Sequence, residues 1–241
     1  MKLFPPTSNW FSGLLAVAFC LISLSGAKAQ LLWYNGDRNA VNSIFGTATG
    51  DSAGFVYDDF TVTDPGGWQI SSVFVNIKLQ SEVSTANWAI LSGVSPGNGG
   101  SVVQSGTGSA LTLTSLGALS GGYTLYQASV TGLNFNLGPG TYWLGVQPIS
   151  DVAGFIVTTS GANAVGTPAG NDGNAYYTET SLGIPLDGKN FESSTTENPN
   201  LGDFSMGVIG IAAVPEPSSS ALCLLGFGLL AVYLRKRLAR V

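Results

Sequence analysis

The strongest constraint on the fold is an alternation of apolar and polar residues with a period of two. Val73, Val75, Ile77 and Leu79 alternate with the residues between them. Because successive side chains of a β-strand point to opposite sides, this spacing predicts a strand with one buried face. Comparable segments occur at 31–34, 54–62, 87–91, 123–131, 133–137, 141–147, 154–158 and 204–212. The last segment is apolar on both faces, which predicts that it is buried on both sides.

Glycine- and proline-rich turns separate these segments. In Asp64-Pro65-Gly66-Gly67, for example, proline suits the second turn position and glycine accepts the positive φ of the third. Many short strands between such turns predict an all-β domain over residues 30–212. We expect a two-sheet antiparallel sandwich of jelly-roll type, with a closed barrel as the alternative. An N-terminal signal helix and a C-terminal transmembrane helix are expected to flank it.

Charge and composition exclude several classes of function. The 241 residues include 14 acids, 9 bases and no histidine. Between residues 30 and 214, three bases (Arg38, Lys78 and Lys189) stand against 13 acids, so no basic surface exists for nucleic acid. The lack of histidine excludes Ser-His-Asp and Cys-His catalysis and His-based zinc sites. The two cysteines fall in the apolar terminal segments, so no disulfide is expected in the domain.

Residues 1–29 have the features of a secretory signal peptide. Lys2 precedes an apolar run at 14–24, which is too short for a comfortable membrane span. Ala27 and Ala29 place small residues at the −3 and −1 positions of a cleavage site before Gln30. The segment therefore predicts export, and an uncleaved N-terminal anchor is the alternative.

Residues 213–241 contain three elements in a fixed order. Pro215-Glu216-Pro217 is followed by an apolar stretch at 221–234 and by the basic cluster Arg235-Lys236-Arg237. The stretch is a marginal membrane span, and the positive-inside rule keeps the basic cluster cytoplasmic. This order predicts a short C-terminal anchor with the domain outside the membrane, or a generic tail anchor in which the tripeptide has no role.

This C-terminal segment resembles the PEP-CTERM sorting signal of Gram-negative bacteria. The resemblance implies that exosortase, a membrane-embedded protease-transpeptidase, recognises Pro215, Glu216 and Pro217. It also implies anchoring in the inner membrane before processing, then a place at the cell surface or in an extracellular matrix of exopolysaccharide or biofilm. The segments 57–62, 68–73 and 140–144 resemble the mature domains of other PEP-CTERM proteins, which implies a sandwich related to carbohydrate-binding modules and no enzyme activity.

Two groups of oxygen-bearing side chains are candidates for calcium, the one cofactor that the sequence suggests. Asp58 and Asp59 are consecutive in a predicted strand, so their side chains should face opposite ways and cannot flank one glycosidic bond. Asn171, Asp172 and Asn174 resemble part of a calcium loop, but the regular spacing and the closing glutamate are missing. The favoured interpretation is structural, with carboxylates bonded to backbone amides and with an Asx-type turn. No cofactor is therefore required.

Tyr176 and Tyr177 are the best candidates for a surface that stacks on sugar rings. We expect a non-catalytic structural or adhesive protein that is linked to exopolysaccharide. One alternative is a carbohydrate- or calcium-dependent binding module. The other is a polysaccharide-active hydrolase that uses dispersed acids.

Overall fold

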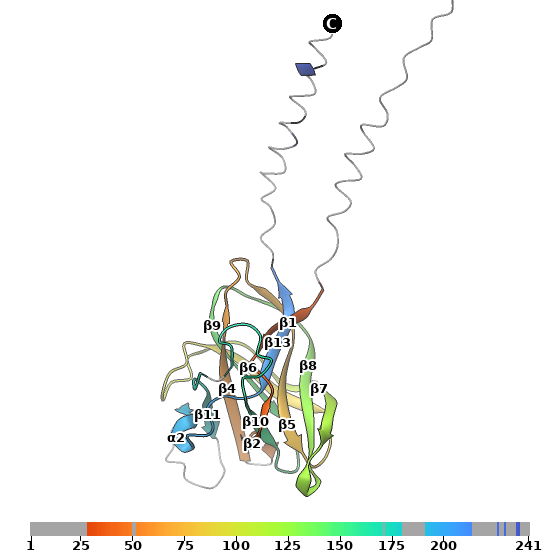
Figure 1. The fold of residues 1–241 in the computed structure, drawn as a ribbon, viewed down its shortest axis with the longest axis vertical. Coiled ribbons are helices and arrows are strands. Elements are labelled where there is room, and N and C mark those ends of the chain that lie inside the picture. The colour runs from red at the N-terminus through yellow and green to blue at the C-terminus, as the bar shows by residue number, and fades with distance from the viewer. Residues whose placement is uncertain are drawn as a thin grey trace, which may run out of the picture.

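The structure, a computed structural model, describes residues 28–49, 52–170, 172–179 and 191–213, together with residues 226, 229, 235 and 236. This part of the chain is all-β, as predicted, and its strands pair antiparallel (Figure 1). Two short helical segments, η1 (Ser120–Gly122) and α2 (Ser194–Glu197), accompany them. The strands are β1 (Gln30–Tyr34), β2 (Arg38–Phe45), β3 (Ala48–Thr49), β4 (Ser52–Val62), β5 (Trp68–Leu79), β6 (Thr85–Ser92), β7 (Ser101–Ala118), β8 (Thr124–Leu137), β9 (Gly140–Pro148), β10 (Phe155–Thr159), β11 (Tyr176–Glu179), β12 (Glu192–Ser193) and β13 (Met206–Ala212).

The strands form one curled sheet. Its path runs β1-β13-β5-β8-β7-β6-β9-β4-β11-β12, while β10 pairs with both β2 and β5, and β3 pairs with β4. The two halves of this path are joined through β7, which is 18 residues long. Its first half, up to Ala110, pairs with β6, and its second half, from Leu111, pairs with β8. The two separate sheets of the expected sandwich are therefore not confirmed, because β7 connects both halves by hydrogen bonds.

Strand β7 was not expected, because its sequence is rich in Gly, Ser and Thr and its apolar alternation is confined to a short stretch around Leu111 and Leu113. Its residues are exposed or half-buried along the whole strand. At one position a small residue is required: a Cβ on Gly106 would lie 2.5 Å from Nε1 of Trp88 on β6. The low hydrophobicity of β7 thus reflects its exposure to solvent and, at Gly106, the close approach of the Trp88 side chain. From the sequence pattern alone, such a segment is assigned to a loop.

The hydrophobic core lies between the two halves of the curled sheet. The alternating residues Val73, Val75, Ile77 and Leu79 are all fully buried, as their spacing predicts. Aromatic rings fill the part of the core nearer the chain ends: Phe60 packs against Trp33, Trp68 and Tyr142 at centroid distances of 5.4, 6.0 and 5.7 Å. Because aromatic side chains bury large areas, this cluster supplies much of the packing that holds the halves together.

A second apolar cluster covers the outer face of β4, β9 and β6. Tyr57, Ala89, Leu91 and Val94 are buried there, with Phe55, Trp143, Tyr176 and Phe191 packed against them. Tyr57 stacks on Phe55 at 4.8 Å and lies 5.3 Å from Phe191. β11 and β12 extend the sheet beyond β4, and Tyr176 of β11 adds to this cluster, so the outer face is not the simple polar surface that an exposed sheet would have (Figure 1).

Several further strands differ from expectation. β2, β3, β11 and β12 were not predicted. β8 is one continuous strand where two were expected, on either side of Gly132. Gly132 has a φ of 74° and lies in a β-bulge, where the register of β8 against β5 shifts between Ile70 and Ser72. The glycine that was expected to end a strand therefore only distorts it. In β13, Val208 is buried, but Ile209 and Ile211 on the other face are only partly buried. The prediction that this strand is buried on both sides was therefore wrong.

The first strand of the domain begins next to the point where the last strand ends. β1 pairs antiparallel with β13, with Gln30 opposite Gly210, and the amide of Ala213 donates to the carbonyl of Gly67. Both chain ends therefore leave the domain at the same end (Figure 1). In the part of the chain that the structure describes, no helix is long and apolar enough to cross a membrane. The predicted signal helix and most of the predicted C-terminal helix fall outside the described residues.

Candidate functional site

Four aspartates gather at the edge of β4. β11 pairs with β4 over 54–57, and further along the strand the amide of Thr61 donates to the carbonyl of Thr167. Asp58 and Asp59 lie between these two contacts, at the point where the loop before β11 and the segment before β13 approach the strand. These segments contribute Asp172 and Asp203 respectively. We call Asp58, Asp59, Asp172 and Asp203 the aspartate cluster.

Asp58 is fully buried, and three donors surround its carboxyl group. Its Oδ2 accepts from Nδ2 of Asn35 at 2.8 Å and from the amide of Phe204 at 2.6 Å, and its Oδ1 accepts from the amide of Asp59 at 3.0 Å. Burial raises the pKa of Asp58 well above its usual value, and the charges of Asp203 and Asp59 raise it further. The hydrogen bonds from Phe204 and Asn35 act in the opposite direction on this pKa.

Asp59 and Asp203 are also buried and carry raised pKa values. Burial, then the charges of Asp172 and Asp203, raises the pKa of Asp59 to about 7. Burial is also the largest cause for Asp203, whose pKa rises to about 6, although a hydrogen bond from the amide of Gly173 to its Oδ2 at 2.9 Å lowers it. Because Asp203 raises the pKa of both Asp58 and Asp59, the buried carboxyls form one electrostatic unit.

Protonation reduces the negative charge of these buried carboxyls. Oδ1 of Asp59 and Oδ1 of Asp203 are buried without a hydrogen-bond partner, as is Oδ1 of Asn35. Unpaired buried carboxylates are costly, so these groups retain protons to a higher pH than exposed aspartates do. Within the described residues, no group of three or more His, Cys, Asp or Glu side chains is arranged to hold a metal ion. A calcium site at these residues stays a prediction.

The structure relates the predicted oxygen ligands to one another only in part. Asp172 meets Asp58 and Asp59 in the aspartate cluster, although it lies more than 110 residues beyond them in the sequence. Asn174 turns toward Asp172, with its Nδ2 2.9 Å from Oδ2 of Asp172, as expected for a turn. Asn171 lies outside the described residues. Asp203 was missed, and the signal available was a lone acid directly before a buried apolar strand.

The predicted sugar-stacking pair does not form. Tyr177 is only 2% exposed and belongs to the main core, with its hydroxyl 3.3 Å from Oε2 of Glu192. Tyr176 points to the other face of β11 and packs in the outer apolar cluster. Since neighbouring residues of a strand face opposite ways, the two rings cannot share one surface, and the prediction for Tyr177 was wrong.

The sorting and cleavage residues lie at or beyond the limits of the described chain. Ala29 is exposed just before β1, and Arg235 and Lys236 are exposed and helical. Ala27, Pro215, Glu216, Pro217 and Arg237 lie outside the described residues. The structure therefore describes the start of the sorting segment, directly after β13, and isolated residues further along it.

Comparison with known proteins identifies this C-terminal segment. The family model of the PEP-CTERM protein-sorting motif matches residues 213–237, which include the Pro-Glu-Pro tripeptide and the basic cluster. No curated protein and no solved structure matches the chain. The match confirms the resemblance of the C-terminal segment and leaves the activity of the β-domain to be argued from its own residues.

Proposed function

We propose, from the premise that this chain is an exported PEP-CTERM protein that exosortase sorts, that its β-domain is a non-catalytic structural or adhesive component of the cell surface or extracellular matrix. The sorting motif at 213–237 carries the proposal. It supports export and anchoring in the membrane before processing. Release to a polysaccharide-containing matrix is the finer step that we add.

The position of the chain ends supports this role. The motif begins at the residue after β13, and β13 pairs with β1, where the chain enters the domain. A domain held by its C-terminal segment would therefore stand on this end. The opposite end, formed by the turns after β5, β7 and β9, would project away from the membrane (Figure 1). Such an orientation suits a domain that meets other matrix components.

The aspartate cluster favours a structural domain over a hydrolase. A glycosidase needs two carboxyls that flank one bond in a cleft. Both oxygens of Asp58 are occupied by donors from the protein itself, and the cavities at Arg38, Tyr34, Trp68 and Glu82 are lined by residues outside this cluster. We therefore propose that the cluster stabilises the loops around β4 and that the protein is not an enzyme. A polysaccharide-active hydrolase stays the alternative.

A calcium-dependent binding module is the second candidate function. The unpartnered buried oxygens of Asp59 and Asp203 favour it, because calcium accepts carboxylate ligands and extracellular modules bind it at about 10⁻⁴–10⁻³ M. The test is a thermal melt at pH 7.5 in EDTA and in millimolar calcium, with magnesium as the control. A calcium-specific rise in Tm that Asp203→Asn abolishes supports this candidate, and equal Tm values in all three conditions reject it.

Intact mass and cell fractionation test the main proposal, in strains with and without a working exosortase. We expect a product that begins at Gln30, ends near Pro217 and is released or surface-located in the first strain, and an uncut C-terminus in the membrane in the second. Glu216→Ala should resemble the second strain, whereas Glu197→Ala, a matched change ahead of the motif, should be processed normally. A full-length C-terminus in the inner membrane of both strains would refute the sorting step.

A further inference from the structure

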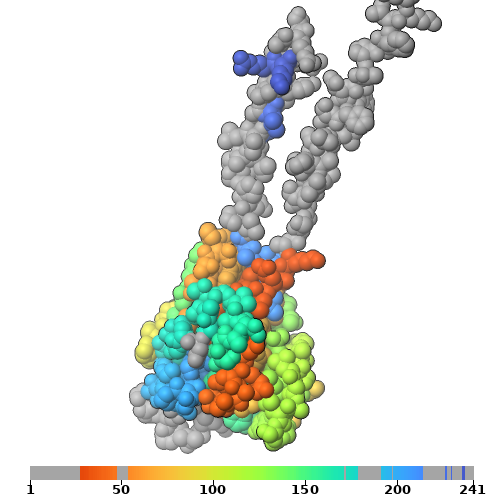
Figure 2. Space-filling view, in the orientation of Figure 1, coloured from red at the N-terminus to blue at the C-terminus, as the bar shows by residue number. Residues whose placement is uncertain are grey.

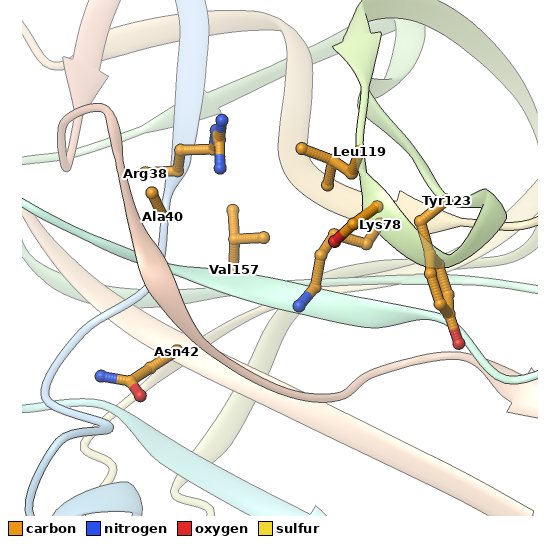
Figure 3. Close-up of a pocket in the computed structure, with 8 residues that line it drawn as sticks. Arg38, Ala40, Asn42, Lys78, Leu119, Tyr123 and Val157 are labelled. Atoms are coloured by element: carbon orange, nitrogen blue, oxygen red, sulfur yellow. The ribbon is translucent and has the colours of Figure 1, made fainter.

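A cavity of about 290 Å³ lies at the end of the domain opposite the two chain ends. Arg38, Ala40 and Asn42 of β2 line one side, and Leu119 and Tyr123 of the β7–β8 connection line the other, with Val157 and Lys78 between them (Figure 3). Figure 2 shows β2 (red) and the β7–β8 turn (green) next to each other at this end. The cavity is thus built where segments far apart in the sequence meet. It is separate from the aspartate cluster.

An irregular stretch of β2 shapes one wall of the cavity. Ser43 lies opposite Val157 of β10, but the next pair joins Arg38 to Thr159, so 39–42 bulge out against a single residue. Oδ1 of Asn39 accepts from the amides of residues 41 and 42, both at 3.0 Å, and holds the bulge. Ala40 consequently adopts a φ of 65°, which is uncommon for a residue with a side chain. Bulges and backbone strain of this kind concentrate at binding sites.

The cavity gathers the positive charge of an acidic domain. Of the cationic residues between 30 and 213, Arg38 and Lys78 are the two that the structure describes, and both line this cavity. Lys78 also lies over the ring of Phe155, with Nζ 5.7 Å from the centroid, which fixes its position. Burial lowers the pKa of Lys78, and the charge of Arg38 lowers it further, so the two positive charges repel each other across the cavity that both residues line.

Among the described residues that line this cavity there is no acid. Asp37, next to Arg38 in the chain, accepts from the hydroxyl of Tyr34 at 3.0 Å and from Nδ2 of Asn163 at 2.7 Å. Asp37 lines a neighbouring cavity, which Arg38 also lines. Two like charges on the walls of one cavity repel each other, and an anion bound between them relieves that repulsion.

We propose that this cavity binds one carboxylate-bearing sugar residue, a uronic acid unit of an acidic polysaccharide. The guanidinium of Arg38 presents a planar fork that matches a carboxylate, and Lys78 adds a point charge. The ring of Tyr123 and the side chains of Leu119 and Val157 provide an apolar wall for the C–H face of a sugar. Asn42 and Ser120 offer hydrogen bonds to hydroxyl groups. The cavity volume is at the small end for ligand sites, which suits a single ring.

The inference deepens the proposed matrix role by naming the chemical class of the polysaccharide. It rests on that role only for the source of the sugar. Binding of a purified oligosaccharide is measured without exosortase, so a failure of sorting and a failure of binding are distinguishable.

Isothermal titration calorimetry of the mature protein with tri-galacturonic acid tests the proposal. Its methyl ester, which has the same shape without the charge, is the control ligand, and inorganic phosphate and acetate test for a simple anion site. Arg38→Gln and Lys78→Gln each remove one positive charge from the cavity. Thr112→Glu is the matched control, because it changes the net charge of the protein by the same amount at an exposed position of β7. Melting curves establish that each variant is folded.

We expect tri-galacturonic acid to bind and the methyl ester not to bind. Each cavity variant should weaken binding about tenfold or more, as loss of a charge-assisted contact does, and Thr112→Glu less than about twofold. Tyr123→Ala should weaken binding of the sugar and leave the weak binding of acetate unchanged. If Arg38→Gln does not fold, Lys78→Gln decides. Absence of binding, equal binding of phosphate, or equal weakening by Thr112→Glu would each overturn the assignment.

Discussion

The aspartate cluster makes the stability of the domain depend on pH in a range where this chain has few other titrating groups. The chain contains no histidine, so between pH 5 and 7 the raised carboxyls are the main side chains that change charge. The pKa of Asp59 is about 7 and that of Asp203 about 6 in the folded protein. In the unfolded chain an aspartate titrates near pH 3.9. The folded state therefore binds more protons than the unfolded state in this range.

The sign of the effect follows from this difference in bound protons. When the folded state holds the extra protons, the free energy of unfolding falls as pH rises, and the stabilisation present at low pH is lost as each group passes its folded pKa. Each extra proton bound by the folded state lowers the free energy of unfolding by at most about 1.4 kcal/mol for each unit of pH increase. Because Asp172 keeps one side of the cluster in contact with solvent, we halve this ceiling and expect a loss of about 1–2 kcal/mol between pH 5 and 7.

Urea unfolding at constant ionic strength in EDTA, at pH 5, 6, 7 and 8, measures this loss. The fluorescence of the buried tryptophans, of which Trp33 is fully buried, reports the transition. Asp59→Asn should make the fall in the free energy of unfolding with pH less steep, by about the contribution of one titrating group. This variant should also be more stable than the wild type at pH 8. Asp151→Asn, at an exposed position, should keep the wild-type slope. A wild-type stability that is constant or rises between pH 5 and 7, or an unchanged slope in Asp59→Asn, would refute the reasoning.

Three further predictions concern packing and buried hydrogen bonds, and each is measured by urea unfolding at pH 6. Phe60→Ala should lower the free energy of unfolding by about 3–5 kcal/mol, since it empties the centre of the aromatic core, whereas Val41→Ala at an 80% exposed position should change it little. Gly106→Ala should cost about 1–3 kcal/mol because its Cβ would press on Trp88; a neutral result would show that the strands separate easily there. Ser205→Ala should cost about 1–3 kcal/mol, because it removes bonds to the carbonyl of Gly36 at 2.6 Å and to Asn76 at 2.7 Å, and a cost like that of Val41→Ala would contradict this.

The sequence determined the class of the domain and the sorting of the chain. The alternation around Val73–Leu79 is a local property, because each strand residue faces one side whatever its partner is. The Pro215–Pro217 tripeptide with its basic cluster is a linear signal, and a family model matches it without reference to the fold. Strands with weak alternation were missed: β7 is polar and exposed, and β2 is interrupted by its bulge.

Only the tertiary structure decided which side chains meet. Asp58 and Asp59 were predicted to act apart because they face opposite ways, yet Asp203, 144 residues beyond Asp59, acts on both carboxyls from the segment before β13. Arg38 and Lys78 likewise line one cavity because β10 pairs with both β2 and β5. Alternation specifies the face of a residue but not its neighbours, which depend on strand order and register. The charge of a buried group depends on those neighbours, so the chemistry of both sites follows from the pairing of the strands.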